Sequence, residues 1–169
     1  MRKSEGPFWI EQLSLKKHPE GGWYKEMYRA EGKISDEKAL SHYGSARHYY
    51  TSIYFLLNES EISAFHRLRS DELWYYHAGS SLTLYVIDQK GSLSTHILGP
   101  GVTRGEHMQL LIPANSWFAA EVNNPLSYTL MGCAVAPGFE FEDFELADGS
   151  RLAEAYPEHE ALIRRLSVN

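Results

Sequence analysis

Hydrophobic and polar residues alternate with a period of two along most of the chain after residue 22, which is the spacing of β-strands. In the first run, Trp23, Lys25 and Met27 fall on one side, and Tyr24 and Glu26 on the other. Further short runs rich in aromatic and β-branched residues follow, at residues 48–57, 62–68, 72–77, 81–87, 92–98, 107–112, 117–122 and 127–135. Turn residues separate them, so the pattern predicts an all-β antiparallel barrel or sandwich.

Helical spacing is confined to the two ends of the chain. Residues 7–16 predict a short N-terminal helix with a proline in its first turn. Residues 151–156 and 157–166 predict a C-terminal helical tail, for which Ser150 is the expected N-cap. Residues 30–46 are polar and predict a long loop that is a candidate lid. We expect residues 1–169 to form a single domain.

Composition narrows the class of partner. Sixteen Lys and Arg residues against 22 Asp and Glu residues give a formal charge of −6, which opposes binding to nucleic acid and to anionic membranes. Cys133 is the only cysteine, so no intrachain disulfide is possible, and its apolar surroundings predict a buried, unreactive thiol. The chain lacks a run of about 18 apolar residues that would predict a membrane span. We therefore expect a cytoplasmic protein.

One motif contains residues that can bind a metal or transfer protons. Ser60, His66, Glu72 and Gly79 are spaced as Ser-x5-His-x5-Glu-x6-Gly, and the segment that begins at Pro113 follows 34 residues after Gly79. This arrangement resembles the two motifs of the cupin superfamily, which run Gly-x5-His-x-His-x3-Glu-x6-Gly and Pro-x-Gly-x2-His. The resemblance implies a cupin-type β-barrel, also called a jelly roll.

The chain departs from these motifs at four positions. Leu68 and Phe118 stand where the family has its second and last histidines, and Ser60 and Asn115 stand where it has glycines. Two of the four usual metal ligands are therefore absent. The ligands that remain are His66 and Glu72, and neither His107 nor Gln109 occupies the position of a third ligand.

Other blocks resemble one cupin family labelled predicted sugar epimerases. They are His-Pro-Glu-Gly-Gly at residues 18–22 and the segments 52–57, 70–74, 132–133 and 136–141. The resemblance covers residues 8–166. It implies a homodimer with a pocket in the barrel mouth for a small molecule, such as a sugar or a sugar nucleotide.

His66 and Glu72 are the candidate catalytic pair, expected on neighbouring strands with both side chains inside the barrel. In an epimerase that needs no metal, His66 would act as general base and Glu72 would hold its tautomer. The same two residues could instead ligate a divalent metal, or bond to each other to support the barrel. All three interpretations stay open.

Strand parity places Glu72, Trp74 and Tyr76 on one face, inward if Glu72 is inward. On the preceding run, parity with an inward His66 makes Arg67 and Arg69 point outward, away from the pocket. Tyr76 is the candidate catalytic acid. Further residues are candidates for substrate binding, namely Tyr24, Tyr28, Tyr54, Trp74, Gln109, Trp117 and Phe118.

Aromatic and acidic residues alternate over residues 139–144, which predicts an edge strand or an arm that faces the dimer partner. Two functions compete with a metal-independent epimerase or isomerase. One is a metal-dependent cupin enzyme, and the other is a metabolite-binding protein without catalysis.

Overall fold

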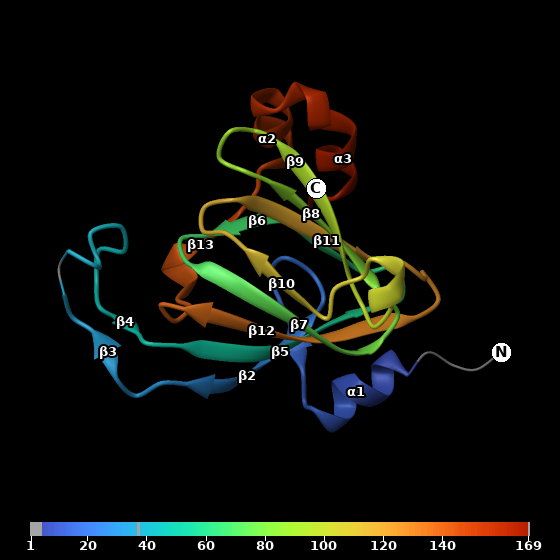
Figure 1. Ribbon diagram of the computed structural model, residues 1–169, viewed down its shortest axis with the longest axis horizontal. Helices are drawn as coiled ribbons and strands as arrows, with labels where there is room; N and C mark the ends of the chain where they lie inside the picture. The colour runs from blue at the N-terminus through green and yellow to red at the C-terminus, as the bar shows by residue number, and fades with distance from the viewer. Residues whose placement is uncertain (1–4, 37, 169) are drawn as a thin grey trace.

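Two antiparallel sheets that face each other form the barrel in the computed structural model, which describes residues 5–36 and 38–168 (Figure 1). The larger sheet has the order β1 (Lys16–Lys17), β2 (Trp23–Arg29), β5 (Thr51–Asn58), β12 (Tyr128–Ala136), β7 (Asp71–Gly79), β10 (Gln109–Ile112). The smaller has the order β13 (Phe144–Leu146), β6 (Ile62–Leu68), β11 (Trp117–Val122), β8 (Leu82–Ile87), β9 (Leu93–Leu98). The jelly roll predicted from the alternating pattern is confirmed.

The period-two alternation divides each strand between two environments. On β5, Phe55 and Leu57 point into the core between the sheets, whereas Leu56 points to the outer face. Trp74, Phe118 and other large side chains complete the inner core. Burial of these apolar surfaces is the main term that holds the sheets together.

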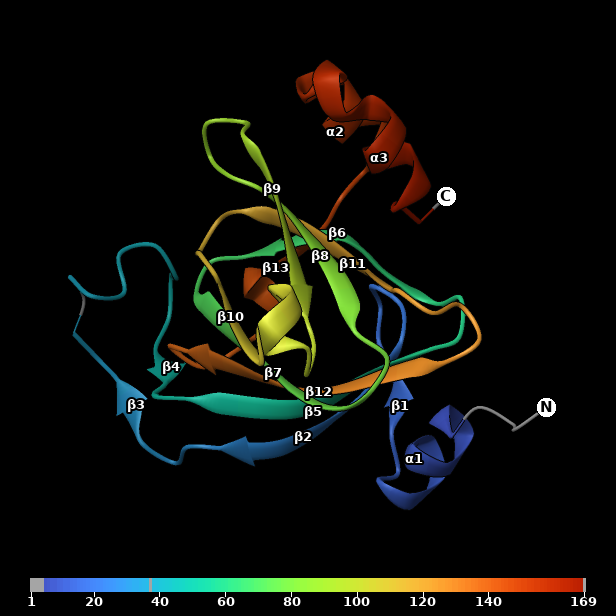
Figure 2. The same ribbon diagram turned by 45° about the vertical axis from the view of Figure 1, so that its right-hand side comes forward.

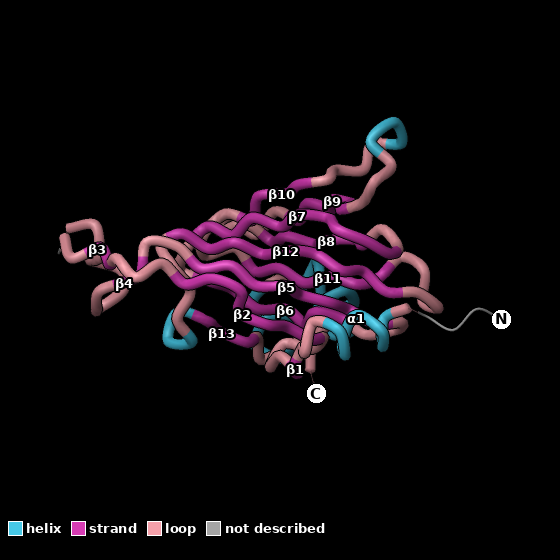
Figure 3. Tube along the Cα trace, turned by 90° about the horizontal axis from the view of Figure 1, so that it is seen from below, coloured by secondary structure: helices cyan, strands magenta, loops and turns pink. Residues whose placement is uncertain are grey.

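Helices cover the outer faces of both sheets (Figures 1 and 2). α1 (Gly6–Gln12) packs with its neighbouring residues against Leu56 and Leu130 of the six-stranded sheet. α2 (Gly149–Ala155), η3 (Pro157–His159) and α3 (Glu160–Arg165) cover the five-stranded sheet, where Ile163 is fully buried. Between β9 and β10, the loop that holds η1 (Val102–Arg104) stands out from the sheets (Figure 3).

The predicted ends of the helices need correction. The N-terminal helix ends at Gln12 rather than at residue 16, because Ser14 has a positive φ of 54° and Lys16–Lys17 pairs with β2. The cap of α2 is Asp148 rather than Ser150, since the Asp148 side chain accepts from the backbone N–H groups of Ser150 and Arg151.

Within the predicted loop at residues 30–46, Lys33–Ile34 forms strand β3, which pairs with β4 (Arg47–His48). The two strands form an arm that projects from the barrel (Figures 1 and 3). Residues 48–57, predicted as one strand, are thus divided between β4 and β5. At the base of the arm, buried Arg47 donates to both carboxylate oxygens of Asp143, at 2.6 and 2.8 Å.

Residues 139–144 do not form one continuous edge strand. η2 (Phe141–Asp143) interrupts them, and only Phe144 belongs to the edge strand β13, which pairs with β6. Phe139, Phe141 and Phe144 line the pocket described below, and Arg47 secures this segment through Asp143.

Candidate functional site

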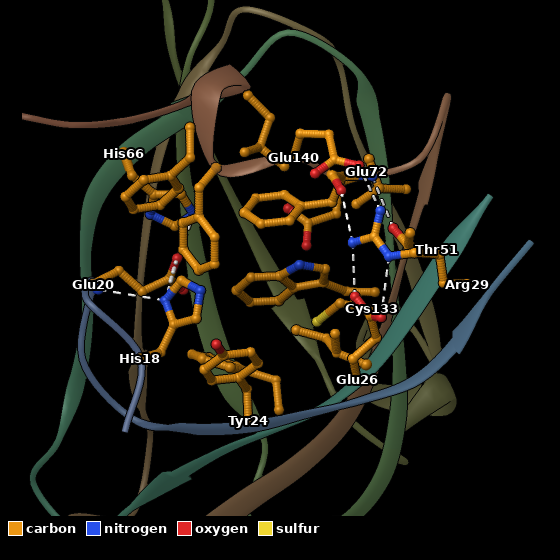
Figure 4. Close-up of a pocket in the computed structure, with 18 of the residues that line it drawn as sticks. His18, Glu20, Tyr24, Glu26, Arg29, Thr51, His66, Glu72, Cys133 and Glu140 are labelled. Carbon is orange, nitrogen blue, oxygen red and sulfur yellow. Dashed lines mark hydrogen bonds and ion pairs between the residues drawn. The ribbon is translucent and has the colours of Figure 1, made fainter. Parts of the chain in front are cut away.

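A cavity of about 270 Å³ opens at the barrel mouth, bounded by both sheets and by the segment around η2. Its walls are aromatic and acidic, and its lining residues are Lys16, His18, Glu20, Tyr24, Glu26, Arg29, Thr51, Ile53, Phe55, His66, Leu68, Glu72, Trp74, Cys133, Val135, Phe139, Glu140, Phe141 and Phe144. Figure 4 shows His18, Glu20 and His66 on one side, and Arg29, Glu72 and Cys133 on the other. The chemistry of the pocket follows from these two groups.

One carboxylate joins two histidines on the first side. Oε2 of Glu20 lies 3.1 Å from Nε2 of His66 and 3.2 Å from Nδ1 of His18. Its other oxygen accepts from the Ser63 hydroxyl at 2.8 Å. All three partners can donate, so Glu20 is well satisfied although it is buried.

A tight turn between β1 and β2 brings Glu20 to this position. Gly21 has a φ of +108°, and a Cβ at this residue would lie 2.2 Å from the carbonyl oxygen of Ile62. The backbone carbonyl of Glu20 accepts from Ala64 N–H at 2.8 Å, which ties the turn to β6. Glycine is required because any side chain here would meet the backbone of β6.

The partners of the two ring nitrogens of His66 indicate which protons its contact with Glu20 needs. Nδ1 of His66 lies 2.7 Å from the Ala64 carbonyl oxygen, which can only accept, so Nδ1 carries a hydrogen. The contact of Nε2 with Glu20 then needs a second proton. Burial lowers the pKa of His66, opposed by the charge of Glu20. Burial alone would raise the pKa of Glu20, but the histidines and Ser63 outweigh it, and that pKa lies below its usual value.

His18 differs from His66 because one of its nitrogens is left for the pocket. Nδ1 faces the Glu20 carboxylate at 3.2 Å; the backbone N–H of Glu20 also approaches it, at a longer 3.4 Å. The shorter contact favours a proton on Nδ1, which leaves Nε2 as an acceptor. Tyr24 and Phe144 contact the ring edge-to-face, with centroid distances of 4.7 and 5.6 Å. Aromatic packing thus fixes the orientation of the imidazole.

The opposite wall holds two buried polar atoms without a partner among the described residues, Oε2 of Glu72 and Nε1 of Trp74. Burial raises the pKa of Glu72 to about 8 and the charge of Glu20 adds to the shift, whereas the nearby Trp74 N–H and Cys133 thiol oppose it. Its carboxyl group is therefore largely protonated at pH 7. Burial likewise raises the pKa of the neighbouring Cys133 thiol well above its usual value, in agreement with the unreactive cysteine expected from the sequence.

Arg29 lies at the edge of the pocket among acidic residues. It donates to Glu26 at 3.1 and 2.8 Å, to Glu140 at 2.6 Å and to the Phe139 carbonyl at 3.1 Å. The hydrogen bonds that Arg29 donates to Glu26 are the largest cause that raises the pKa of Arg29. The guanidinium is thus held by groups of the chain itself.

Of the residues predicted from the sequence, the structure brings His66, Glu72, Tyr24 and Trp74 together in the pocket. Glu72 and Trp74 share the inner face of β7, and Tyr76 packs against the same core, as parity predicted. Tyr76 does not line the pocket, and its hydroxyl donates to the Gly79 carbonyl at 2.7 Å. Burial raises the pKa of Tyr76, the opposite of what a catalytic acid near neutral pH needs.

The other predicted binding residues lie outside the pocket lining. Tyr28 and Gln109 are exposed, and Tyr54 lies on the outer face against His77. Trp117 also points outward, beneath Arg67 and the C-terminal helices, because it alternates with inward Phe118. The ring of Phe118 contacts that of His66, with centroids 4.0 Å apart, and supports it from the core.

His66 and Glu72 are not on neighbouring strands. β6 belongs to the five-stranded sheet and β7 to the six-stranded sheet, so the two residues approach the pocket from opposite sides. The carboxylate that contacts the His66 ring is that of Glu20, rather than that of Glu72 as the sequence predicted. Arg67 bonds to Glu145 on the outside of the barrel, as the parity argument predicted.

Sequence reasoning missed His18, Glu20, Glu26, Arg29 and Glu140. The block at residues 18–22 is one of those that resemble the family, and its acidic and imidazole side chains are the signal that indicates a site. Glu20 meets His66 of β6, and Arg29 meets Glu140, which directly precedes η2, so spacing along the chain does not relate these partners.

The cupin motif implies a metal, but the residues here do not fit one. Among residues 5–36 and 38–168, no group of three or more His, Cys, Asp or Glu side chains has the arrangement to hold a metal ion. His66 uses both nitrogens on Ala64 and Glu20, and Glu72 lies on the opposite wall. We therefore derive no step through a metal.

Two solved structures are similar over nearly the whole chain. A hypothetical protein from Leishmania major is 38% identical with a TM-score of 0.87, and the match covers 96% of this chain and 98% of that one. A protein from Shewanella oneidensis, solved by X-ray crystallography, is 40% identical with a TM-score of 0.87 and 99% coverage of both chains.

A third structure shares the fold alone. It is a variant of oxalate decarboxylase from Bacillus subtilis, 15% identical with a TM-score of 0.54, and the match covers 89% of this chain and 36% of that one.

The search of curated proteins returned no match. Within the described residues, no helix has the length and apolar character needed to cross a membrane. The family model described as "Cupin superfamily (DUF985)" matches residues 7–147. With the jelly-roll fold and the two relatives of 38% and 40% identity, this match shows that the chain belongs to the DUF985 family of the cupin superfamily.

Proposed function

We propose that the pocket binds a small hydroxylated carbonyl compound, such as a sugar, and isomerises or epimerises it by acid–base chemistry of the chain's own residues. The observation that carries the proposal is the unpaired Oε2 of Glu72 and Nε1 of Trp74, both buried at the pocket wall. Buried polar atoms without partners are costly, so a bound ligand that satisfies them is favoured.

The Glu72 and Trp74 atoms are placed to bind a carbonyl oxygen of the substrate. The Trp74 N–H and the protonated carboxyl of Glu72 can both donate to it. Donors aimed at this oxygen stabilise the enolate that forms when a neighbouring C–H loses its proton, and a buried, neutral carboxylic acid is suited to this role.

His18 is the proposed general base. Its Nε2 would take the proton from carbon, and Glu20 would stabilise the resulting imidazolium through Nδ1. For isomerisation, the imidazolium returns the proton to the neighbouring carbon, while the hydroxyl proton of the first carbon passes to the enolate oxygen, so that the carbonyl group moves by one carbon. For epimerisation, the imidazolium returns the proton to the same carbon after the enolate has turned, and the carbonyl group re-forms where it was. The hypothesis that His66 is the base is replaced, because both of its nitrogens are bonded within the protein.

Solvent-deuterium exchange tests this proposal. A panel of aldoses and ketoses is incubated with the protein in D₂O, and incorporation at carbon is followed by NMR. We expect exchange with the wild type and a loss of about 10²–10⁴-fold in His18→Gln. His77→Gln is the matched control, since His77 lies on the outer face against Tyr54. Equal exchange in wild type and His18→Gln would contradict the role of His18.

A metabolite-binding protein without catalysis is the second candidate, because the same unpaired atoms would hold a ligand whether or not a proton moves. It is distinguished by binding of a sugar, measured calorimetrically, without deuterium incorporation in the wild type.

Assembly as a homodimer stays a prediction of the family resemblance. Sedimentation velocity of the full chain checks it, with a mass of twice 19.3 kDa expected.

A further inference from the structure

We propose that the pocket mouth selects uncharged sugars and rejects sugar phosphates and sugar nucleotides, and that Glu26, Arg29 and Glu140 set this selectivity. The inference rests on the proposed function of the same site and names its substrate class.

Arg29 is the cation that a phosphate would be expected to use, but its donors are already engaged. Both guanidinium edges face carboxylates, with Nη1 to Glu140 at 2.6 Å and Nη2 to Glu26 at 2.8 Å. Nη2 also donates to the Phe139 carbonyl. A phosphate would have to displace two charge-assisted contacts to reach Arg29, so Arg29 gives it little net attraction.

The remaining charges of the lining do not favour an anion. Glu26 and Glu140 carry two negative charges against the one positive charge of Arg29, and buried Glu20 lies deeper in the cavity. Lys16 adds one exposed ammonium, 5.1 Å from the centre of the Tyr24 ring. The two positive charges of Arg29 and Lys16 only balance the negative charges of Glu26 and Glu140, so a dianionic phosphate that entered this cavity would meet no net attraction.

The interior matches a neutral ligand. Its two unpaired polar atoms belong to Trp74, which is neutral, and to Glu72, which is more than nine-tenths buried and mostly protonated at pH 7. Aromatic rings that can pack on the faces of a sugar surround them. A cavity of about 270 Å³ lies at the small end of ligand sites, which suits a monosaccharide and leaves no room for a nucleotide.

Calorimetric titration of the full chain tests this with three sets of probes, namely free pentoses and hexoses, the same sugars as phosphate esters, and nucleoside diphosphate sugars. We expect at least one free sugar to bind at least about tenfold more tightly than its phosphate ester. Glu140→Gln removes a negative charge and weakens one of the contacts that hold Arg29, so it should reduce this preference. Glu145→Gln, which breaks a similar Arg67 ion pair outside the pocket lining, should leave the preference unchanged.

Tighter binding of any phosphate ester or nucleotide sugar by the wild type overturns the inference, as does a lack of binding of every free sugar. The role of the mouth residues is overturned if Glu140→Gln leaves the preference for free sugars over phosphate esters intact. It is also overturned if Glu145→Gln reduces that preference equally. The two proposals can fail independently. Binding of free sugars without deuterium exchange would refute the proposed catalysis but not the selectivity. Deuterium exchange confined to phosphorylated sugars would refute the selectivity but not the catalysis.

Discussion

Nε2 of His66 lies 3.1 Å from Oε2 of Glu20, and this contact joins β6 to the turn that precedes β2. The other ring nitrogen of His66 is bonded to the Ala64 carbonyl. The histidine that matches the cupin motif is therefore part of the internal support of the pocket, and His18 is the imidazole with a nitrogen left for a ligand.

His66→Gln should lower the free energy of unfolding by about 2–4 kcal/mol, because it breaks a buried charge-assisted contact and leaves Glu20 with one donor fewer. His18→Gln should cost less, about 1 kcal/mol, since His18 bonds to Glu20 through one nitrogen, whereas His66 bonds to Glu20 and to the Ala64 carbonyl through two. Urea unfolding at pH 7 measures both. A larger loss in His18→Gln than in His66→Gln would show that we have assigned the two histidines the wrong way round.

Glu72 should make the protein less stable as the pH rises. Burial raises the pKa of Glu72 in the folded state to about 8, above its ordinary value of 4.5, so the folded state binds the extra proton. The stabilisation is fully present below pH 4.5 and is lost as the pH rises to about 8, by a few kcal/mol in all.

Glu72→Gln resembles the protonated acid but cannot ionise. The substitution should therefore remove the part of the pH dependence of the unfolding free energy that comes from Glu72. The variant should match the wild type near pH 5 and be the more stable protein at pH 9, in chemical denaturation at both pH values. Parallel pH profiles of the two proteins would mean that Glu72 titrates near its ordinary pKa.

Gly21→Ala should destabilise the protein by about 3 kcal/mol or more, since the new Cβ would meet the Ile62 carbonyl at 2.2 Å in addition to the cost of a positive φ. Gly44→Ala is the matched control. Gly44 also has a positive φ, of +79°, but its Cβ would meet nothing within 4 Å, and a cost of about 1 kcal/mol is expected. Thermal and urea unfolding compare the two, and equal losses would show that the approach to β6 imposes no constraint.

Arg47→Met should cost about 3–5 kcal/mol, because it leaves the buried Asp143 carboxylate without its main partner. Arg47→Met combined with Asp143→Leu should recover much of this loss, since no buried charge is then left unpaired. A double-mutant cycle of unfolding free energies measures the coupling. A double variant that equals the sum of the single changes would show that the two side chains do not act as a pair.

The barrel could be predicted because it follows from the alternation of hydrophobic and polar residues along each strand. Alternation along residues 62–68 and 72–77 assigned inner and outer faces correctly, including the inward Glu72 and Trp74 and the outward Arg67. The same parity did not settle Trp117 and Phe118, because two adjacent large aromatic residues suit either face. In the structure Phe118 faces the core and Trp117 the C-terminal helices.

Period-two burial and short motifs are local properties, so the amino-acid order was enough to predict the strands, the barrel, the cupin family and the place of His66 and Glu72 at an inner surface. Which groups meet depended on how the chain folds. Glu20 and His66 are 46 residues apart and Arg29 and Glu140 are 111 apart, and they come together through sheet pairing and a turn between strands. Hydrogen bonds, burial and protonation depend on such distant contacts, so the partner of His66 and the free nitrogen of His18 followed from the fold alone.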